Sequence, residues 1–186
     1  VDCNRGQKIA TALDQGDFRK PVVINVRGTC REFVTITRAK ITIHSAEGKM
    51  LENDIAYIDI NTFGDRTTPE LRDALDELLK QNPKGIIIDL RNNPGGYLTT
   101  AVEVSSEFID EGVILYEQYG DGRRDEHKAL GNGQATDIPI VVLINEGSAS
   151  ASEILAGALQ DYERAKLVGV QSYGKGSVQN WVPLSN

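Results

Sequence analysis

One segment near the end of the chain, residues 140–179, constrains the possible folds more than any other. It begins with a short apolar run rich in β-branched residues, Ile140–Ile144, which is typical of a buried strand in a parallel or mixed sheet. A turn of small residues follows at 147–152, and then a helical pattern with apolar side chains on one face. A second strand-like run at 165–170 leads to Gly174-Lys175-Gly176. The segment therefore predicts a strand, a helix and a strand, with a serine where the helix begins and a lysine on the following loop.

A second unit of this kind lies earlier in the chain. The apolar run at 86–90 ends in a glycine turn at 91–96, and a helical pattern follows at 98–109. Ligands in open α/β sheets gather where strands end, so the turns at 91–96 and 145–150 could lie side by side. Another helix begins at Thr67-Thr68-Pro69 and carries a leucine stripe. These alternating elements predict the α/β fold class.

The remaining segments predict antiparallel additions. Strand-like runs occur at 21–27 and 32–37, separated by a hairpin-sized loop, and further short strands are expected at 41–44, 55–60 and 112–116. Residues 120–128 are dense in charge and predict a solvated loop.

Composition excludes several classes of function. The chain has 186 residues, 40% of them hydrophobic, which predicts a globular domain with or without a small appendage. Its net charge of −7 argues against a nucleic-acid surface. No stretch reaches the roughly 18 apolar residues of a membrane span. Cys3 and Cys30 could pair or stay free, and they lack the spacing of a zinc site.

The serine and the lysine of the first segment can act as a nucleophile and its base. A serine hydroxyl is inert until a base takes its proton, and lysine can do so only where desolvation keeps the amine neutral. Free backbone N–H groups at a helix start also suit an oxyanion. A structural interpretation stays open as well, because Ser150 and Glu153 have capping-box spacing and a Gly-Lys-Gly loop is usually an exposed turn.

Rival chemistries find weaker support. A Ser/His/Asp triad would need His44 or His127, the only two histidines, and no motif surrounds either. Asp161 lies about three helical turns beyond Ser150, too far for direct contact. Residues 169–176 nearly match a phosphate-binding loop, but Gly176 stands where a serine or threonine would hold magnesium. We therefore reject nucleotide binding.

Two separated motifs resemble a known family. Residues 145–153 (NEGSASASE), 156–161 (AGALQD) and 174–179 (GKGSVQ) are similar to the signature of the carboxy-terminal processing (tail-specific) serine peptidases, family S41, which use a Ser/Lys dyad. Residues 88–97 (IDLRNNPGGY) resemble that family's second signature. The resemblance runs from about Thr37 to Gln179.

The resemblance assigns a role to six residues. It implies that Ser150 is the nucleophile, Lys175 the general base and Gln179 the residue that orients the lysine. The N–H groups of Gly96 and Ala151 would form the oxyanion hole. Glu153 would support the dyad, and neither a metal nor an organic cofactor is expected.

The resemblance also implies a fold and a setting. Residues 37–186 would form a ClpP/crotonase-like core of βα units, and residues 1–36 a partial PDZ-like element or its replacement. The expected activity is endopeptidase cleavage near the C-terminus of flexible protein substrates, with homo-oligomers possible. The expected location is extracytoplasmic (periplasm, cell envelope or an equivalent lumen), which would tolerate a Cys3–Cys30 disulfide.

Two alternatives remain. The chain could be a non-catalytic ligand- or peptide-binding member of the same fold, although Ser150, Lys175 and Gln179 are all present. It could also be an inactive or regulated fragment that holds Lys175 too loosely for catalysis, since a misplacement of about 1 Å can cost on the order of 100-fold in rate.

Overall fold

The structure, a computed structural model, describes residues 22–25, 33–36 and 44–179. The chain divides into two units, Val1–Ile43 and His44–Asn186. In the first unit, β1 (Val22–Asn25) and β2 (Phe33–Ile36) pair antiparallel, as their sequences predict. Cys3 and Cys30 lie outside the described residues, so their pairing stays a prediction.

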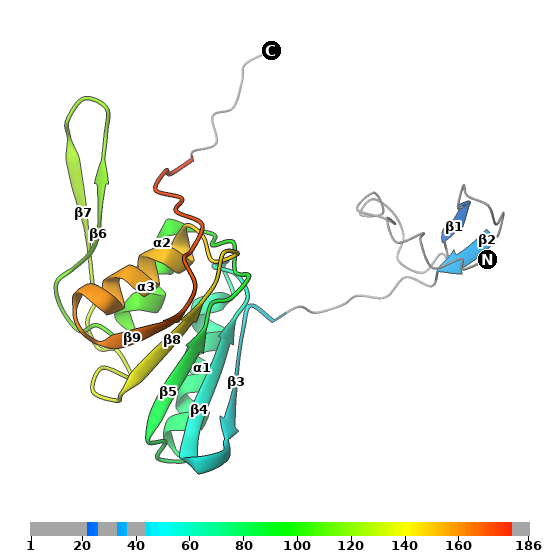
Figure 1. Ribbon diagram of the computed structural model, residues 1–186, viewed down its shortest axis with the longest axis horizontal. Coiled ribbons are helices and arrows are strands. Elements are labelled where there is room, and N and C mark those ends of the chain that lie inside the picture. The colour runs from blue at the N-terminus through cyan, green and yellow to red at the C-terminus, as the bar shows by residue number, and fades with distance from the viewer. Residues whose placement is uncertain (1–21, 26–32, 37–43, 180–186) are drawn as a thin grey trace. The chain divides into compact units, whose positions relative to one another are not determined.

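The second unit is built on a five-stranded, mostly parallel sheet (Figure 1). Its strands, in spatial order, are β3 (Ala46–Leu51), β4 (Ile55–Ile60), β5 (Gly85–Asp89), β8 (Ile140–Ile144) and β9 (Ala165–Gly169). Only β3 runs antiparallel to its neighbour. The α/β class and the strands expected near 55–60, 86–90, 140–144 and 165–170 are confirmed.

Three helices connect the parallel strands: α1 (Thr67–Leu79), α2 (Leu98–Ser106) and α3 (Ala151–Asp161). The parallel strands are added in one direction across the sheet, and such crossovers are right-handed, so all three helices must cover the same face. Side chains of the strands alternate accordingly: Ala56, Ile58 and Ile60 are buried, whereas Tyr57 is only half-buried. Ile58, Ile88 and Val142 join Leu71 and Leu155 in one core.

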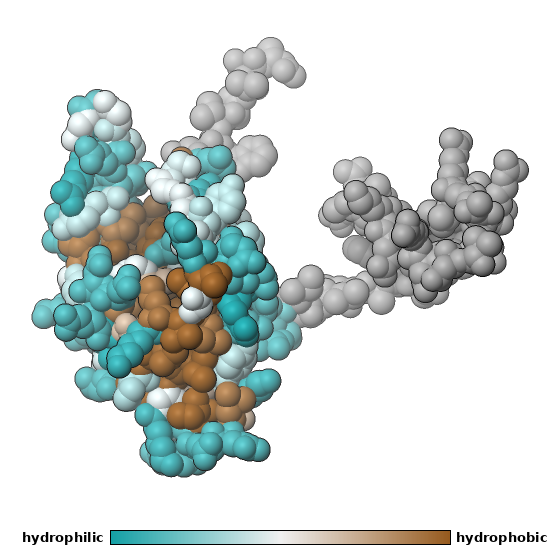
Figure 2. Space-filling model, in the orientation of Figure 1, coloured by the Kyte–Doolittle hydropathy of each residue, from teal (hydrophilic) through white to brown (hydrophobic). Residues whose placement is uncertain are grey.

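The opposite face of the sheet carries apolar side chains with no helix over them. Ile87, Val141 and Leu143 are half-buried there, and Val168 is exposed. Figure 2 shows the hydrophobic surface that they contribute to. Within the described part of the chain, no helix has both the length and the hydropathy that crossing a bilayer requires.

One expected strand, at 41–44, falls almost entirely outside the described residues and stays a prediction. The sequence did not predict β3, which follows at Ala46–Leu51. Its sequence AEGKML lacks β-branched residues, and it pairs with β4 at the edge of the sheet.

The expectation for the charged segment at 120–128 is wrong, because β7 (Arg124–Lys128) is found where a solvated loop was expected. It pairs antiparallel with β6 (Val113–Gln118) in a hairpin outside the main sheet. Two cation–π contacts hold the pair: the Arg124 guanidinium lies 3.3 Å from the centre of the Tyr116 ring, and that of Arg123 lies 3.8 Å from Tyr119. A prediction of a loop from the density of charged residues is therefore wrong for β7.

The two faces of β5 should differ in their contribution to stability. Ile88 is fully buried under the helices, so Ile88→Ala should lower the free energy of unfolding by about 3 kcal/mol through lost burial and a cavity. Its neighbour Ile87 is half-buried on the other face, and Ile87→Ala should cost about 1 kcal/mol. Urea denaturation of both variants measures the difference. Equal losses would mean that both faces are packed alike.

Candidate active site

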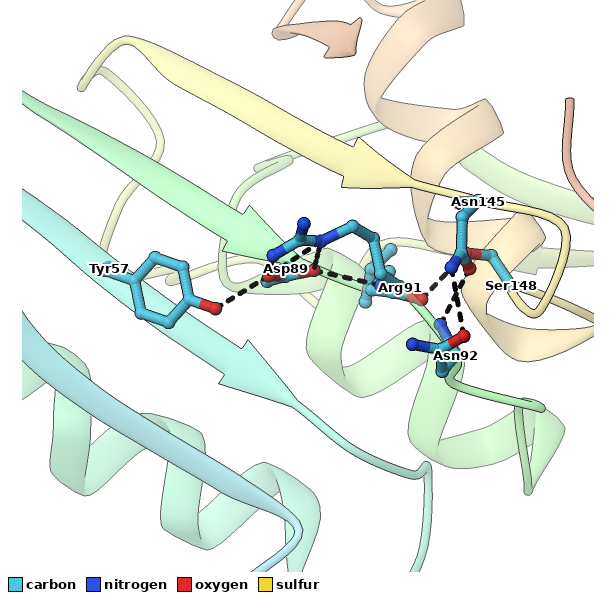
Figure 3. A network of polar contacts seen from close by, with 7 residues as sticks. Tyr57, Asp89, Arg91, Asn92, Asn145 and Ser148 are labelled. Atoms are coloured by element: carbon cyan, nitrogen blue, oxygen red, sulfur yellow. Dashed lines mark hydrogen bonds and ion pairs between the residues drawn. The ribbon is translucent and has the colours of Figure 1, made fainter. Parts of the chain in front are cut away.

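The turns that follow β5 and β8 lie side by side, as the sequence predicts (Figure 3). The backbone N–H of Asn92 donates to the side-chain oxygen of Asn145 at 2.8 Å, and the amide nitrogen of Asn145 donates to the side-chain oxygen of Asn92 at 3.0 Å. Ala149 N–H donates to the carbonyl of Asn93 at 3.0 Å. These bonds join two loops that are more than 50 residues apart in sequence.

An ion pair fixes the first of these turns where it leaves β5. The Arg91 guanidinium binds the carboxylate of Asp89, which also accepts a 2.7 Å hydrogen bond from the Tyr57 hydroxyl (Figure 3). Burial favours a higher pKa for Asp89, but the bonds from Arg91 and Tyr57 outweigh it and hold that pKa below its ordinary value. Burial and the bond to Asp89 raise the pKa of Tyr57 to about 12. Arg91 therefore has a local structural role at the start of this turn.

Two glycines allow the first turn to approach its neighbours. Gly95 and Gly96 have φ of +97° and +155°, where side chains are strained. A Cβ on Gly95 would lie 2.6 Å from the Ala149 carbonyl oxygen, and one on Gly96 would overlap the carbonyl of Phe63. Among the described residues the N–H of Gly96 donates to no acceptor, so it is available to a ligand.

Three serines in the second turn have different surroundings. The Ser148 hydroxyl donates to Leu90 O at 2.7 Å and that of Ser152 to Asn93 O at 3.0 Å, and both residues are buried. Ser150 lies between them, half-buried, and lines a pocket. Two of the serines are therefore part of the packing between the turns, and the middle one is accessible.

Ser150 also holds an unusual backbone conformation. Its φ of 55° and ψ of −114° match the first central position of a type II′ turn, which glycine normally occupies. Such strain costs about 1–3 kcal/mol and clusters at functional sites. α3 begins at the next residue, Ala151, whose N–H makes no hydrogen bond to any other described residue.

The carboxylate of Glu153 joins the serine turn to the lysine loop. One oxygen accepts the N–H of Ser150 at 2.8 Å and that of Lys175 at 2.9 Å. The other accepts the N–H of Gly174 at 2.6 Å and the hydroxyl of Ser172 at 2.7 Å. Burial favours a higher pKa for Glu153, but these four donors outweigh it and hold the pKa below its ordinary value.

Ser150 and Lys175 line the same pocket, which has a volume of about 600 Å³. Ile154 and residues 176–178 contribute to the same side, and residues 115–120 of the β6–β7 hairpin form the opposite wall. Gln179 is exposed and does not line this pocket. The structure thus brings together five of the six residues assigned from sequence. Ser150 and Lys175 line the pocket, Glu153 binds the backbone of both, and Gly96 and Ala151 lie in the adjoining turns.

The two histidines lie elsewhere. His44 is 3.3 Å from Glu70 and His127 is 3.3 Å from Glu117, and neither lines the pocket. Within residues 22–25, 33–36 and 44–179, no three His, Cys, Asp or Glu side chains are grouped as metal ligands.

Sequence reasoning missed two parts of the site. The pairing of Asn92 with Asn145 could have been predicted from the sequence. Each asparagine comes shortly after a buried strand, and the two strands are neighbours in the sheet. The wall formed by β6 could not, because nothing in its sequence relates it to a serine more than 30 residues away.

A serine at a strand–helix turn and a lysine in the same pocket are the arrangement expected of a serine-type hydrolase. The chain belongs to peptidase family S41, whose model matches residues 54–186. It is 40% identical over 177 residues to the carboxy-terminal processing protease CtpA of Bacillus subtilis, covering 95% of this chain and 38% of that protein. It is also 40% identical over 156 residues to the carboxyl-terminal-processing protease of Synechocystis, covering 82% of this chain and 36% of the relative.

A solved structure gives the same relationship. The photosystem II D1 C-terminal processing protease superposes with a TM-score of 0.70 at 34% identity, over 80% of this chain and 42% of that one. The chain therefore spans less than half the length of these relatives.

The strained backbone of Ser150 predicts a difference between two small substitutions. Ser150→Gly should be more stable than Ser150→Ala by about 1 kcal/mol, because glycine adopts positive φ without strain. Urea denaturation measures it. Ser148→Gly against Ser148→Ala is the matched control and should show no such gain, since Ser148 is not among the positive-φ residues. A Ser150→Gly variant that is the less stable of its pair would contradict the strain.

The four bonds to Glu153 predict the behaviour of the lysine loop. In Glu153→Gln only one acceptor oxygen remains, so the protection of the Gly174 and Lys175 amides against hydrogen exchange should fall by about tenfold. Glu146→Gln, at an exposed position in the neighbouring turn, should leave it unchanged.

The wild type should lose the same protection in acid. Because the folded pKa of Glu153 is lowered, its carboxylate stabilises the loop above the ordinary glutamate pKa of about 4.3, and this is lost as the pH falls through the lowered value. Protection that is independent of both the substitution and acid would show that the loop is held by other contacts.

Proposed function

We propose that this chain carries the catalytic centre of a serine endopeptidase that cleaves flexible protein substrates near their C-terminus. The single observation behind the proposal is that one pocket is lined by both Ser150 and Lys175. Of the three serines in the turn, Ser150 is the accessible one with a strained backbone. The names of the relatives, which are carboxyl-terminal processing proteases, support this substrate class.

The chemistry is acyl transfer through a Ser/Lys dyad. The Ser150 hydroxyl oxygen attacks the scissile carbonyl carbon while the uncharged amine of Lys175 takes the hydroxyl proton. The tetrahedral intermediate then collapses, the peptide C–N bond breaks, and the lysine ammonium returns that proton to the leaving amine. Water, deprotonated by the same amine, hydrolyses the acyl-enzyme and restores the Ser150 hydroxyl.

The oxyanion of the intermediate would be held by the N–H groups of Gly96 and Ala151. Both groups lack an acceptor among the described residues, and the turns that carry them are joined by hydrogen bonds. Gln179 would orient the lysine amine, a role that requires its exposed side chain to enter the pocket. Glu153 would maintain the geometry by holding the backbone of both Ser150 and Lys175.

The finer assignment of the fold and setting belongs to this proposal. Residues 37–186 would form a ClpP/crotonase-like peptidase core, and residues 1–36 a partial PDZ-like element or its replacement. The reaction requires no metal or organic cofactor, since the serine supplies the nucleophile and the lysine moves the proton. An extracytoplasmic location would bring the enzyme to exported proteins with unstructured tails.

The dyad is tested by removing each member. Ser150→Ala and Lys175→Ala should each reduce cleavage of an unstructured fluorogenic peptide by at least about 1,000-fold. Lys175→Arg should be equally inactive, because a guanidinium stays protonated and cannot act as a base. Steady-state kinetics and covalent labelling by a fluorophosphonate probe provide the measurements.

Two controls make the result specific. Lys166→Ala removes an exposed lysine on β9, outside the Ser150 pocket, and should keep wild-type cleavage. Ser148→Ala should remain reactive towards the probe even if its stability falls. A wild type that neither cleaves nor reacts, with no difference in Ser150→Ala, would leave a non-catalytic binding protein or an inactive fragment as the better description.

A further inference from the structure

The β6–β7 hairpin has two free edges that differ in chemistry. The two strands form a sheet of their own, so each has one edge without a partner strand among the described residues. Every residue of β7 is polar and ionisable, Arg124-Asp125-Glu126-His127-Lys128, and such charge discourages another strand from pairing. β6, with the sequence VILYEQ, has one charged residue and no such protection.

The register identifies the backbone groups on the open edge of β6. Tyr119 N–H donates to the carbonyl of Arg123, its directly opposite residue, at 2.8 Å. In an antiparallel pair such hydrogen-bonded positions alternate with positions whose N–H and C=O point away from the partner. Since Gln118 lies opposite Arg124 and Tyr116 opposite Glu126, the N–H and C=O groups of Tyr116 and Gln118 point away from β7.

This open edge runs along the pocket of Ser150. A pocket against the face of a ribbon would touch alternate residues, but this one touches the consecutive residues 115–120 and none of β7. The unpaired donors and acceptors of β6 therefore face the serine and the lysine across the pocket.

The edge is held in place at both ends. At the base of the hairpin, the Tyr162 hydroxyl beyond the end of α3 donates to the carbonyl of Val113 at 3.1 Å. Near the tip, Arg123 and Arg124 stack on Tyr119 and Tyr116. A template strand fixed in this way loses little conformational entropy when a peptide pairs with it.

We propose that the substrate polypeptide is bound as an extended strand along the open edge of β6, paired with the backbone of Tyr116 and Gln118. The inference rests on the proposed peptidase function and adds the element that recognises the substrate main chain. Recognition through the backbone is independent of sequence and requires an unstructured segment of about six residues. Folded proteins are excluded because their backbone groups are already paired.

Proline substitution tests the edge, because it removes one N–H donor. In the intact chain, Gln118→Pro should raise KM for an unstructured fluorogenic peptide by about tenfold with a smaller change in kcat. Glu126→Pro is the matched control: its N–H lies on the outer edge of β7, and KM should stay within about twofold. Neither change removes a bond between β6 and β7, and thermal denaturation checks that both variants fold.

A second measurement does not depend on turnover. In Ser150→Ala saturated with the same peptide, the amides of Tyr116 and Gln118 should gain protection from hydrogen exchange, and that of Glu126 should not. Equal KM values in the two proline variants, or binding without protection at Tyr116 and Gln118, would overturn strand addition. A wild type that cleaves nothing would instead contradict the proposed function, and the exchange pattern would still decide whether peptide binds along β6.

Discussion

The geometry of the candidate site depends on the carboxylate of Glu153. Its four hydrogen bonds reach Ser150 on one side and the segment from Ser172 to Lys175 on the other. The lysine loop has no regular secondary structure, so a half-buried carboxylate that accepts several of its N–H and O–H donors can fix it where helix or sheet bonds do not. A residue with the spacing of a helix cap thus also connects the proposed nucleophile with its proposed base.

The sequence predicted those parts of the fold in which local pattern and tertiary environment agree. Ile86–Ile88 and Ile140–Ile144 are continuous apolar runs because both faces of a central parallel strand are at least partly covered. The turns that follow these strands are neighbours because the strands pair. β3 and β7 were missed because each is an edge strand without a β-branched residue, so its side chains carry little of the usual strand signal. The contribution of β6 to the pocket depends on tertiary packing between distant segments, which the local sequence does not show.

The choice among the three serines shows a similar limit. Sequence spacing allows any of Ser148, Ser150 and Ser152 to lie at the start of the helix, and the family resemblance selected the middle one. Packing gives the physical reason: Ser148 and Ser152 each donate to a carbonyl of the neighbouring turn, at Leu90 and Asn93. These flanking bonds, together with Glu153, offset the strain of Ser150 and explain how a serine keeps a conformation suited to glycine.

The division of labour between rigid and open elements follows from these contacts. The turns at the carboxyl edge of the sheet are tied by paired asparagines and by glycines that admit no side chain, so the groups proposed for chemistry are held by backbone geometry. The hairpin opposite is outside the sheet and leaves backbone donors and acceptors unpaired at the pocket. A fixed reacting group beside an unpaired strand edge suits a substrate that has backbone hydrogen bonds to offer, and an unstructured polypeptide is the substrate with most of them.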